Sequence, residues 1–134
     1  MTLQVPEGFL LASADDPAET RVGPFYKNKN TQRTGMFTEP GHCNDSGIVH
    51  GGILMTFADF TISALALWAC PGESVVTVSL NCDFMASGEA GAWISGQGTV
   101  LRRTNSLVFA QGTVSSDDTT LLAFNGVIKH RPPR

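Results

Sequence analysis

The run from Gly51 to Ala69 constrains the fold more than any other part of this sequence. It is apolar almost throughout, carries a single charged residue, Asp59, and holds neither glycine nor proline beyond the opening Gly51-Gly52 pair. These residues form helices readily, and Pro71-Gly72 follows where such a helix would end. A helix that is hydrophobic on nearly every face must be enclosed by other structure. The rest of the chain is therefore expected to wrap around this helix.

Segments on both sides of the helix have the pattern of β-strands. Strands are expected at residues 25–27 and 33–38 before the helix, and at 76–84, 92–102, 107–114 and 121–129 after it. In the first of these later strands, one face is expected to carry Val76, Val78, Leu80, Cys82 and Phe84. Short turns join the later strands, which predicts an antiparallel meander. The expected fold class is α+β, with an antiparallel sheet wrapped around one long central helix.

The two ends of the chain carry weaker patterns. The 134 residues fit a single domain, 1–134, in which residues 1–20 form a variable N-terminal segment. A short helical turn is expected at 7–14, and the tail from His130 to Arg134 is expected to be frayed.

Charged residues are scarce, and this bears on the partners of the chain. They make up 16% of the sequence, whereas the hydrophobic fraction is an ordinary 42%. A small protein with so few charges is expected to cover part of its surface with a second copy, although a monomer with a surface rich in Ser, Thr, Asn and Gly fits the same composition. The net charge of −3 and the lack of a dense basic run argue against a nucleic-acid partner.

The sequence also predicts where the protein works. The 3 cysteines include no C-x-x-C pair, and no basic start followed by an apolar stretch marks a secretion signal, so a cytoplasmic protein with reduced thiols is expected. The apolar helix contains Thr56, Asp59, Thr61 and Ser63 and lacks flanking Lys or Arg. It is therefore expected to be a buried helix and not a membrane span.

Asp59 is the first candidate for chemistry, because burying an unpaired carboxylate is costly. Thr56 and Ser63 lie on its face at helical spacing and are expected to donate hydrogen bonds to it. A carboxylate that is satisfied in this way, with no further role, is the simpler alternative.

The Gly51-Gly52 pair is the second candidate, since it stands where the helix begins. The first N–H groups of a helix have no partner within it and lie at the positive end of its dipole. Glycine lets a ligand carbonyl approach that backbone closely, so an oxyanion-type site is plausible at Gly51. A glycine needed only for loop geometry is the alternative.

Helical geometry places Asp59 and the Gly51-Gly52 pair far apart on one chain. Eight residues from Gly51 to Asp59 correspond to about 12 Å along a helix axis. His50 and Asp59 project on roughly opposite faces. Two chains related by a twofold axis bring the start of one helix to Asp59 of the other, which predicts a composite site at a dimer interface.

One motif resembles a known family. The pattern His42-x-Asn44-x-x-Gly47-x-x-His50-Gly51-Gly52, followed by Asp59, resembles the hotdog-fold acyl-CoA thioesterases of the PaaI-like type, a group that includes thioesterase superfamily member 2. The resemblance covers roughly residues 33–130 and includes the Pro-Gly break and the strand after the helix. It implies the hotdog fold, hydrolysis of acyl-CoA by water without cofactor or metal, and dimers that commonly pair into tetramers.

The resemblance also implies roles for particular residues. Asp59 matches a catalytic acid that acts as general base or as nucleophile, and Gly51 matches the backbone donor to the thioester carbonyl. Asn44 matches a loop side chain that assists this donor, and Thr77 matches a hydroxyl that orients the water. Strict alternation, however, places Thr77 on the polar face of its strand.

Substrate-binding residues follow from the same resemblance. His50 and Gly52 lie beside the expected site, and Arg102 and Arg103 are candidates for the CoA phosphates, although charges at a strand end are usually only solvated. No spacing of histidine and cysteine matches a common zinc pattern, so no metal is expected.

Two other functions remain open at this point, a hotdog hydratase or dehydratase and a non-catalytic acyl-CoA binding protein. The acyl group is open as well. It depends on a cleft for which Met55, Phe57, Phe60 and Phe84 are candidate lining residues.

Overall fold

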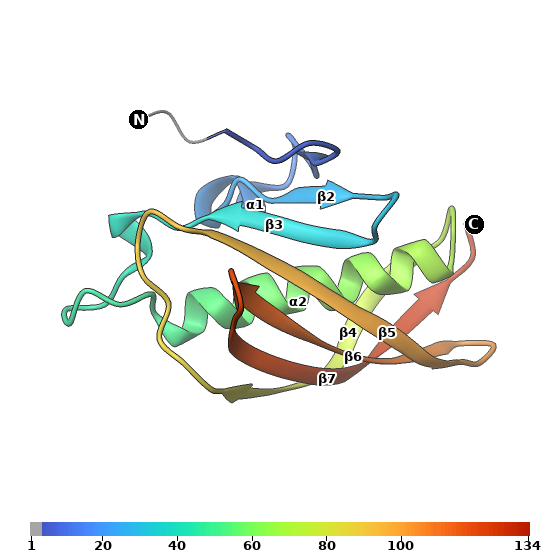
Figure 1. Cartoon of the computed structure of the whole chain (residues 1–134). Coiled ribbons are helices and arrows are strands. Elements are labelled where there is room, and N and C mark those ends of the chain that lie inside the picture. Colours follow the sequence, from blue (N-terminus) through green and yellow to red (C-terminus); the bar gives the residue numbers. More distant parts are fainter. Residues whose placement is uncertain (1–3) are drawn as a thin grey trace.

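The computed structural model describes residues 4–134, and in it one long helix lies across a single antiparallel sheet (Figure 1). The sheet has 7 strands in the order β1-β2-β3-β5-β6-β7-β4. The elements are β1 (Leu10–Leu11), α1 (Pro17–Val22), β2 (Tyr26–Asn28), β3 (Arg33–Phe37), the 3-10 turn η1 (Pro40–His42), α2 (Gly51–Ala69), β4 (Ser74–Phe84), β5 (Trp93–Arg103), β6 (Leu107–Ser116) and β7 (Thr119–Arg131). The predicted α+β arrangement is confirmed, and α2 has the bounds expected from its apolar run.

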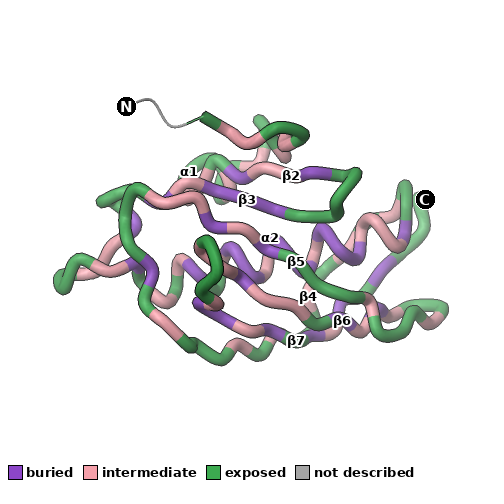
Figure 2. The backbone as a smooth tube through the Cα atoms, viewed as in Figure 1, coloured by how far each residue is buried: buried purple, intermediate pink, exposed green. Residues whose placement is uncertain are grey.

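The core forms between α2 and the inner face of the sheet, where Figure 2 shows buried stretches along both. Phe57, Ile62 and Ala66 of α2 are fully buried, and a buried Phe or Ile contributes about 1.5–3 kcal/mol to folding. Glycines in the strands let the helix come close. A Cβ built on Gly96 would lie 2.4 Å from Thr61 Oγ1, and one on Gly126 would lie 2.9 Å from Ile62 Cδ1.

The sheet covers only one side of α2. A stripe at helical spacing stays partly exposed and includes Gly52, Met55, Asp59 and Ser63. Because the apolar Met55 is 39% exposed on this stripe, the single chain does not enclose the helix on every face. The length of α2 and its mean hydropathy of 1.6 are also those of a membrane-spanning helix. In this fold, however, half of its most apolar 18-residue stretch is buried inside the protein.

A β-bulge in β4 changes the faces that alternation predicts. The register with β7 shifts between Thr77 and Ser79, so one extra residue enters the strand there. Before the bulge Thr77 faces α2, and after it Leu80 faces the core. The prediction that Val76 and Val78 share a face with Leu80 is therefore wrong, and both valines are 60% exposed. They lie on the terminal strand of the sheet, whose one neighbour is β7.

The two ends of the chain also differ from the predictions. The short helical turn expected at 7–14 is absent, since residues 10–11 form β1 and pair with Tyr26 and Lys27. The first helix is α1, where the Asp16 side chain accepts a hydrogen bond from Glu19 N–H and Pro17 opens the first turn. The tail is not frayed at His130, because β7 extends through Arg131 and His130 is only 4% exposed.

Candidate active site

The start of α2 offers one free backbone donor. His50 is the N-cap residue, and its ring atom Nδ1 accepts a hydrogen bond from Gly52 N–H at 3.0 Å. The N–H groups of Ile53 and Leu54 donate to the His50 carbonyl. Within residues 4–134, Gly51 N–H has no acceptor. The positive end of the helix dipole is therefore presented through Gly51.

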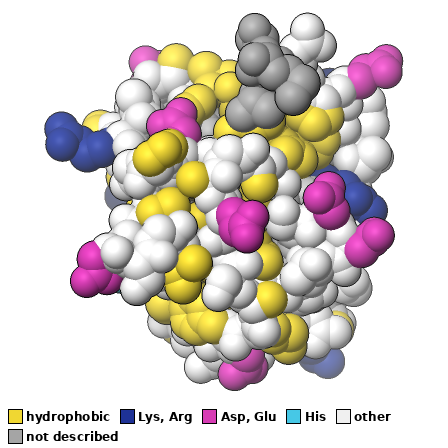
Figure 3. All heavy atoms as spheres, turned by 60° about the vertical axis from the view of Figure 1, so that its left-hand side comes forward, with side chains coloured by type: hydrophobic (Ala, Val, Ile, Leu, Met, Phe, Trp, Pro, Cys, Tyr) yellow, Lys and Arg dark blue, Asp and Glu magenta, His cyan; other side chains and the backbone are white. Residues whose placement is uncertain are grey.

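An open pocket of about 330 Å3 lies beside this donor. Six of its nine lining residues are apolar, and they come from the loop before α2, from α2 itself and from the end of β4 and the residues after it: Asn44, Ile48, Val49, Gly51, Leu54, Phe84, Met85, Ala86 and Ser87. Figure 3 brings this end of the molecule forward and shows hydrophobic side chains recurring across it between separate carboxylates. The arrangement suits a ligand with a carbonyl oxygen and an apolar substituent.

Asn44 shapes the loop that leads into α2. Its Oδ1 accepts hydrogen bonds from Ser46 N–H at 2.9 Å and from Ile48 N–H at 3.3 Å. The loop turns at Gly47, which has a φ of 80°. Because Asn44 Oδ1 is occupied by the loop, its amide N–H groups are the part of the side chain that can reach a ligand.

Asp59 is held by the strand and not by its own helix. Thr77 Oγ1 donates to Asp59 Oδ1 at 2.6 Å, across from α2 to β4. The prediction that Thr56 and Ser63 donate hydrogen bonds to Asp59 is wrong. Thr56 donates instead to the Gly52 carbonyl at 2.9 Å, and Ser63 makes no bond to Asp59 in the described part of the chain. The bulge after Thr77 explains how this threonine leaves the polar face that alternation assigns to it.

Cys82 lies on the same inner face of β4. Burial, with the nearby carboxylates of Asp83 and Asp59, raises the pKa of the Cys82 thiol. The thiol therefore stays protonated at neutral pH and is a poor nucleophile. The Asp59 carboxylate therefore remains the candidate for the chemistry on this part of the molecule.

The structure brings the candidate residues together in two separate groups. Asp59 is bonded to Thr77, and Gly51 shares its pocket with Asn44. Asp59 and Gly51 belong to the same helix and lie about 12 Å apart along its axis. One chain does not bring the Asp59 carboxylate to the Gly51 donor.

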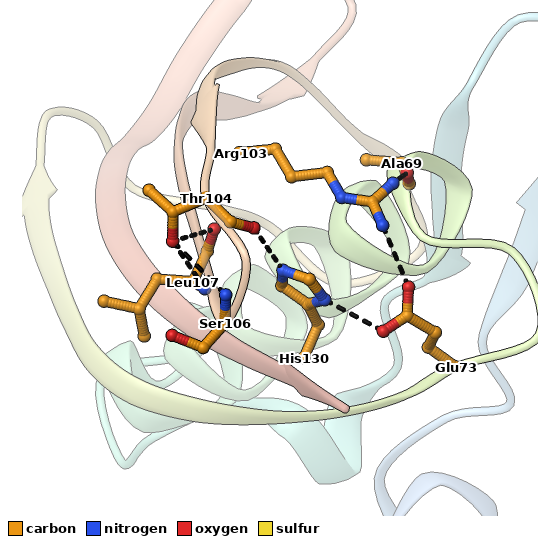
Figure 4. A network of polar contacts seen from close by, with 7 residues as sticks. All are labelled: Ala69, Glu73, Arg103, Thr104, Ser106, Leu107 and His130. Atoms are coloured by element: carbon orange, nitrogen blue, oxygen red, sulfur yellow. Dashed lines mark hydrogen bonds and ion pairs between the residues drawn. The ribbon is translucent and has the colours of Figure 1, made fainter. Parts of the chain in front are cut away.

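Arg103 ends β5 and lies at the far end of α2 (Figure 4), and Arg102 precedes it on the same strand. Arg103 is already engaged, since Nη1 donates to the Ala69 carbonyl at 2.6 Å and Nη2 pairs with Glu73 at 3.0 Å. Arg102 is exposed and has no side-chain partner among the residues that the structure describes. It is the more available of the two for an anionic ligand.

His42, the first histidine of the motif, fastens the loop to α1. Its Nδ1 accepts from Glu39 N–H at 2.9 Å, so Nε2 carries the proton and donates to the Val22 carbonyl at 2.5 Å. Both ring nitrogens are used and the side chain is buried. This histidine supports the fold of the site and does not reach a ligand.

A polar network that the sequence did not predict lies around His130 (Figure 4). Its Nδ1 is 2.9 Å from Glu73 Oε1 and its Nε2 is 2.8 Å from the Thr104 carbonyl. Both partners are acceptors, so the protonated ring can donate to each of them, and this favours the charged form of His130. Ligand-type atoms of Cys70, Glu73 and His130 lie within 4.8 Å of one another. In this structure Glu73 pairs with Arg103 and with the His130 ring.

Comparison with known proteins gives a consistent result. A family model described as the Thioesterase superfamily matches residues 46–123. A Pseudomonas aeruginosa protein named "Putative esterase PA0474" is 31% identical over 134 residues, which cover 97% of this chain and 99% of that one.

Solved structures show the same fold. The Escherichia coli PaaI protein from the phenylacetic acid degradation operon has a TM-score of 0.73 at 17% identity, over 87% of this chain and 86% of that one. Zebrafish thioesterase superfamily member 2 has a TM-score of 0.70 at 23% identity, over 87% and 88%. A Bacillus halodurans protein, BH2602, solved with CoA, has a TM-score of 0.68 at 22% identity, over 74% and 66%. The resemblance inferred from the motif is confirmed.

Proposed function

This chain belongs to the thioesterase superfamily and is a thioester hydrolase with the hotdog fold, and we propose that it cleaves acyl-CoA at a site shared by two copies. One observation carries the proposal. The only unpaired N–H at the described start of α2 is that of Gly51, and this residue lines a pocket with several apolar side chains. A thioester carbonyl that accepts from this N–H is polarised for attack, with its acyl group in the pocket.

Asp59 either activates the water that attacks the carbonyl carbon or attacks that carbon itself. Its Oδ1 is held by Thr77, so Oδ2 is left to take a proton from water. The water oxygen then bonds to the carbonyl carbon, the C–S bond breaks, and the proton passes to the departing CoA sulfur. Direct attack by Asp59 Oδ2 would give a mixed anhydride that water hydrolyses in a second step. Both routes use the same carboxylate and the same Gly51 donor.

The second copy supplies what one chain lacks. The exposed stripe of α2 carries Asp59, and the neighbouring edge strand exposes Val76 and Val78. An edge strand with open backbone groups and apolar side chains invites a partner strand. A twofold axis beside β4 would cover the stripe and bring Gly51 of each copy toward Asp59 of the other. The low content of charged residues agrees with a covered surface, and pairing of dimers into tetramers is part of the same proposal.

The remaining candidates take supporting roles in this proposal. The His50 side chain caps the helix by accepting a hydrogen bond from Gly52 N–H. This bond holds the first turn in place and so orients the neighbouring Gly51 N–H. Asn44 assists through its amide N–H groups. Arg102 is free to pair with a CoA phosphate, whereas Arg103 is held by Glu73. We place the protein in the cytoplasm, where acyl-CoA is available and thiols stay reduced.

An acyl-CoA panel tests this function directly. Purified protein is mixed with short, medium, long and aryl acyl-CoAs, and free thiol is measured. Asp59→Asn is expected to lower kcat by at least about a hundredfold while acyl-CoA still binds. The matched control is Asp83→Asn, an exposed carboxylate on β4, which is expected to keep its activity. Full turnover by Asp59→Asn would refute the role of Asp59. Binding without hydrolysis by the wild type would instead support the non-catalytic alternative.

A further inference from the structure

The four side chains expected to line the acyl cleft fall into two groups. Phe57 and Phe60 are core residues, packed against Phe25 with ring centroids 5.6 and 4.7 Å away. Met55 and Phe84 are exposed, Phe84 by 52%. Only this second pair can reach a substrate, and of the two only Phe84 lines the pocket at the start of α2.

The Phe84 ring lies directly against Gly51. A Cβ built on Gly51 would be 3.3 Å from Cε1 and 3.5 Å from Cζ of the ring. The ring therefore occupies the space into which a side chain on the first residue of α2 would project, and it lines the same pocket as that residue. A carbonyl oxygen that accepts from the Gly51 N–H places its own carbon and the neighbouring atoms beside the ring.

The backbone fixes the position of this aromatic wall. Phe84 ends β4 in register with Leu122, and the next residue, Met85, donates its N–H to the Leu121 carbonyl at 2.8 Å. The strand thus anchors the Cα of Phe84 while half of its side chain faces solvent. A wall that is fixed at its base selects by shape more sharply than a loop side chain does.

We infer that Phe84 selects the acyl group by excluding branches on the carbon next to the carbonyl. This inference rests on the proposed function, since it takes Gly51 N–H as the carbonyl donor. We place the acyl group of the substrate, and not its polar pantetheine arm, beside the Phe84 ring. The reason is that Ile48, Val49 and Leu54 also line this pocket. A methyl group next to the carbonyl meets the Phe84 ring, whereas a methyl group at the far end of the chain does not.

Isomeric substrates test this inference. For the chain length that the wild type prefers, kcat/KM is measured for the 2-methyl acyl-CoA and for its isomer with the methyl branch near the end of the chain. Phe84→Ala is expected to raise the ratio of the first to the second by about tenfold or more, the effect of one methylene in an apolar pocket. Phe84→Trp is expected to lower the ratio. Leu10→Ala, which truncates an exposed apolar residue outside the pocket, is the control and keeps the wild-type ratio.

Each other outcome has a defined meaning. An unchanged ratio in an active Phe84→Ala protein would overturn this inference and leave the proposed function standing. An equal loss on all substrates, together with dissociation in light scattering, would overturn it too, because Phe84 would then act only in subunit contact. A wild type that cleaves no acyl-CoA would refute the proposed function and this inference with it.

Discussion

Among residues 4–134, the one hydroxyl group that donates to the Asp59 carboxylate is that of Thr77. The short bond of 2.6 Å to Oδ1 orients the carboxylate and leaves its second oxygen for a proton. A hydrogen bond to a charged group is worth about 1.5–3 kcal/mol, which is enough to decide how well the carboxylate is aimed. In the proposed mechanism, Thr77 therefore positions Asp59.

Thr77→Val keeps the shape of the side chain and removes this hydrogen bond. The expected result is a kcat lower by about tenfold to a hundredfold, because roughly 1.5–3 kcal/mol of orientation is lost. Steady-state kinetics measures it, and urea unfolding checks that stability is retained. Thr77→Ser restores the hydroxyl and is expected to restore most of kcat. A valine variant with wild-type kcat would show that Asp59 does not need this bond.

At the scale of elements, α2 is fastened differently at its two ends. At its start the His50 cap leaves the Gly51 donor open. Just beyond its end, Glu73 joins His130 of β7 and Arg103 of β5, so the sheet and the helix are tied together there. The end of the helix away from Gly51 is therefore tied to the sheet by side-chain pairs.

This anchor makes stability depend on pH. The hydrogen bond to Glu73, supported by the Thr104 carbonyl, raises the pKa of His130 above its ordinary value of 6.5. The folded state thus binds the proton more tightly than the unfolded chain. The contribution of His130 to stability is fully present below about pH 6.5 and is lost as the pH rises through the raised pKa. The other groups that face it are Arg103, which opposes the proton, and the thiol of Cys70, which burial keeps neutral.

Urea unfolding at several values between about pH 6 and pH 9 checks this prediction. Wild-type protein is compared with His130→Gln, which keeps the size of the side chain and cannot become charged. The stability difference between them is expected to be largest at the acidic end and to shrink as the pH rises. In a Glu73→Gln protein, the free energy of unfolding is expected to depend less on pH than it does in the wild type. A difference that is equal at every pH would contradict a charged His130.

The elements show which features a sequence can predict. The bounds of α2 follow from a local pattern, an apolar run between Gly51 and Pro71, and the later strands follow from alternation and turns. The bulge after Thr77 and the burial of His130 do not, because both depend on neighbouring strands. Within the site, Asp59 and Gly51 stand out by composition. Their separation follows from helix geometry. The hydrogen bond from Thr77 to Asp59, and the fact that Phe84 alone of the four candidate lining residues reaches the pocket, appear only in three dimensions.

For the whole molecule, the proposal requires a second copy along β4. Val78 is 60% exposed on this edge strand, so Val78→Lys places a charge where the partner strand would lie. The expected result is a monomer with an intact fold and an activity lowered by at least about tenfold, because each site would lose its second half. Light scattering and thiol release measure the two effects. Leu10→Lys, on an exposed residue of β1, is the control, and an active monomeric Val78→Lys would refute the shared site.

The most direct test of the shared site is complementation between two inactive variants. Asp59→Asn removes the carboxylate. Gly51→Pro removes the donor N–H at the first helical position, where proline is well tolerated. Each heterodimer would contain one intact site, with Gly51 from one chain and Asp59 from the other. Random mixing is therefore expected to restore about a quarter of the wild-type activity. No recovery, with heterodimers confirmed by native mass spectrometry, would contradict a site made by two copies.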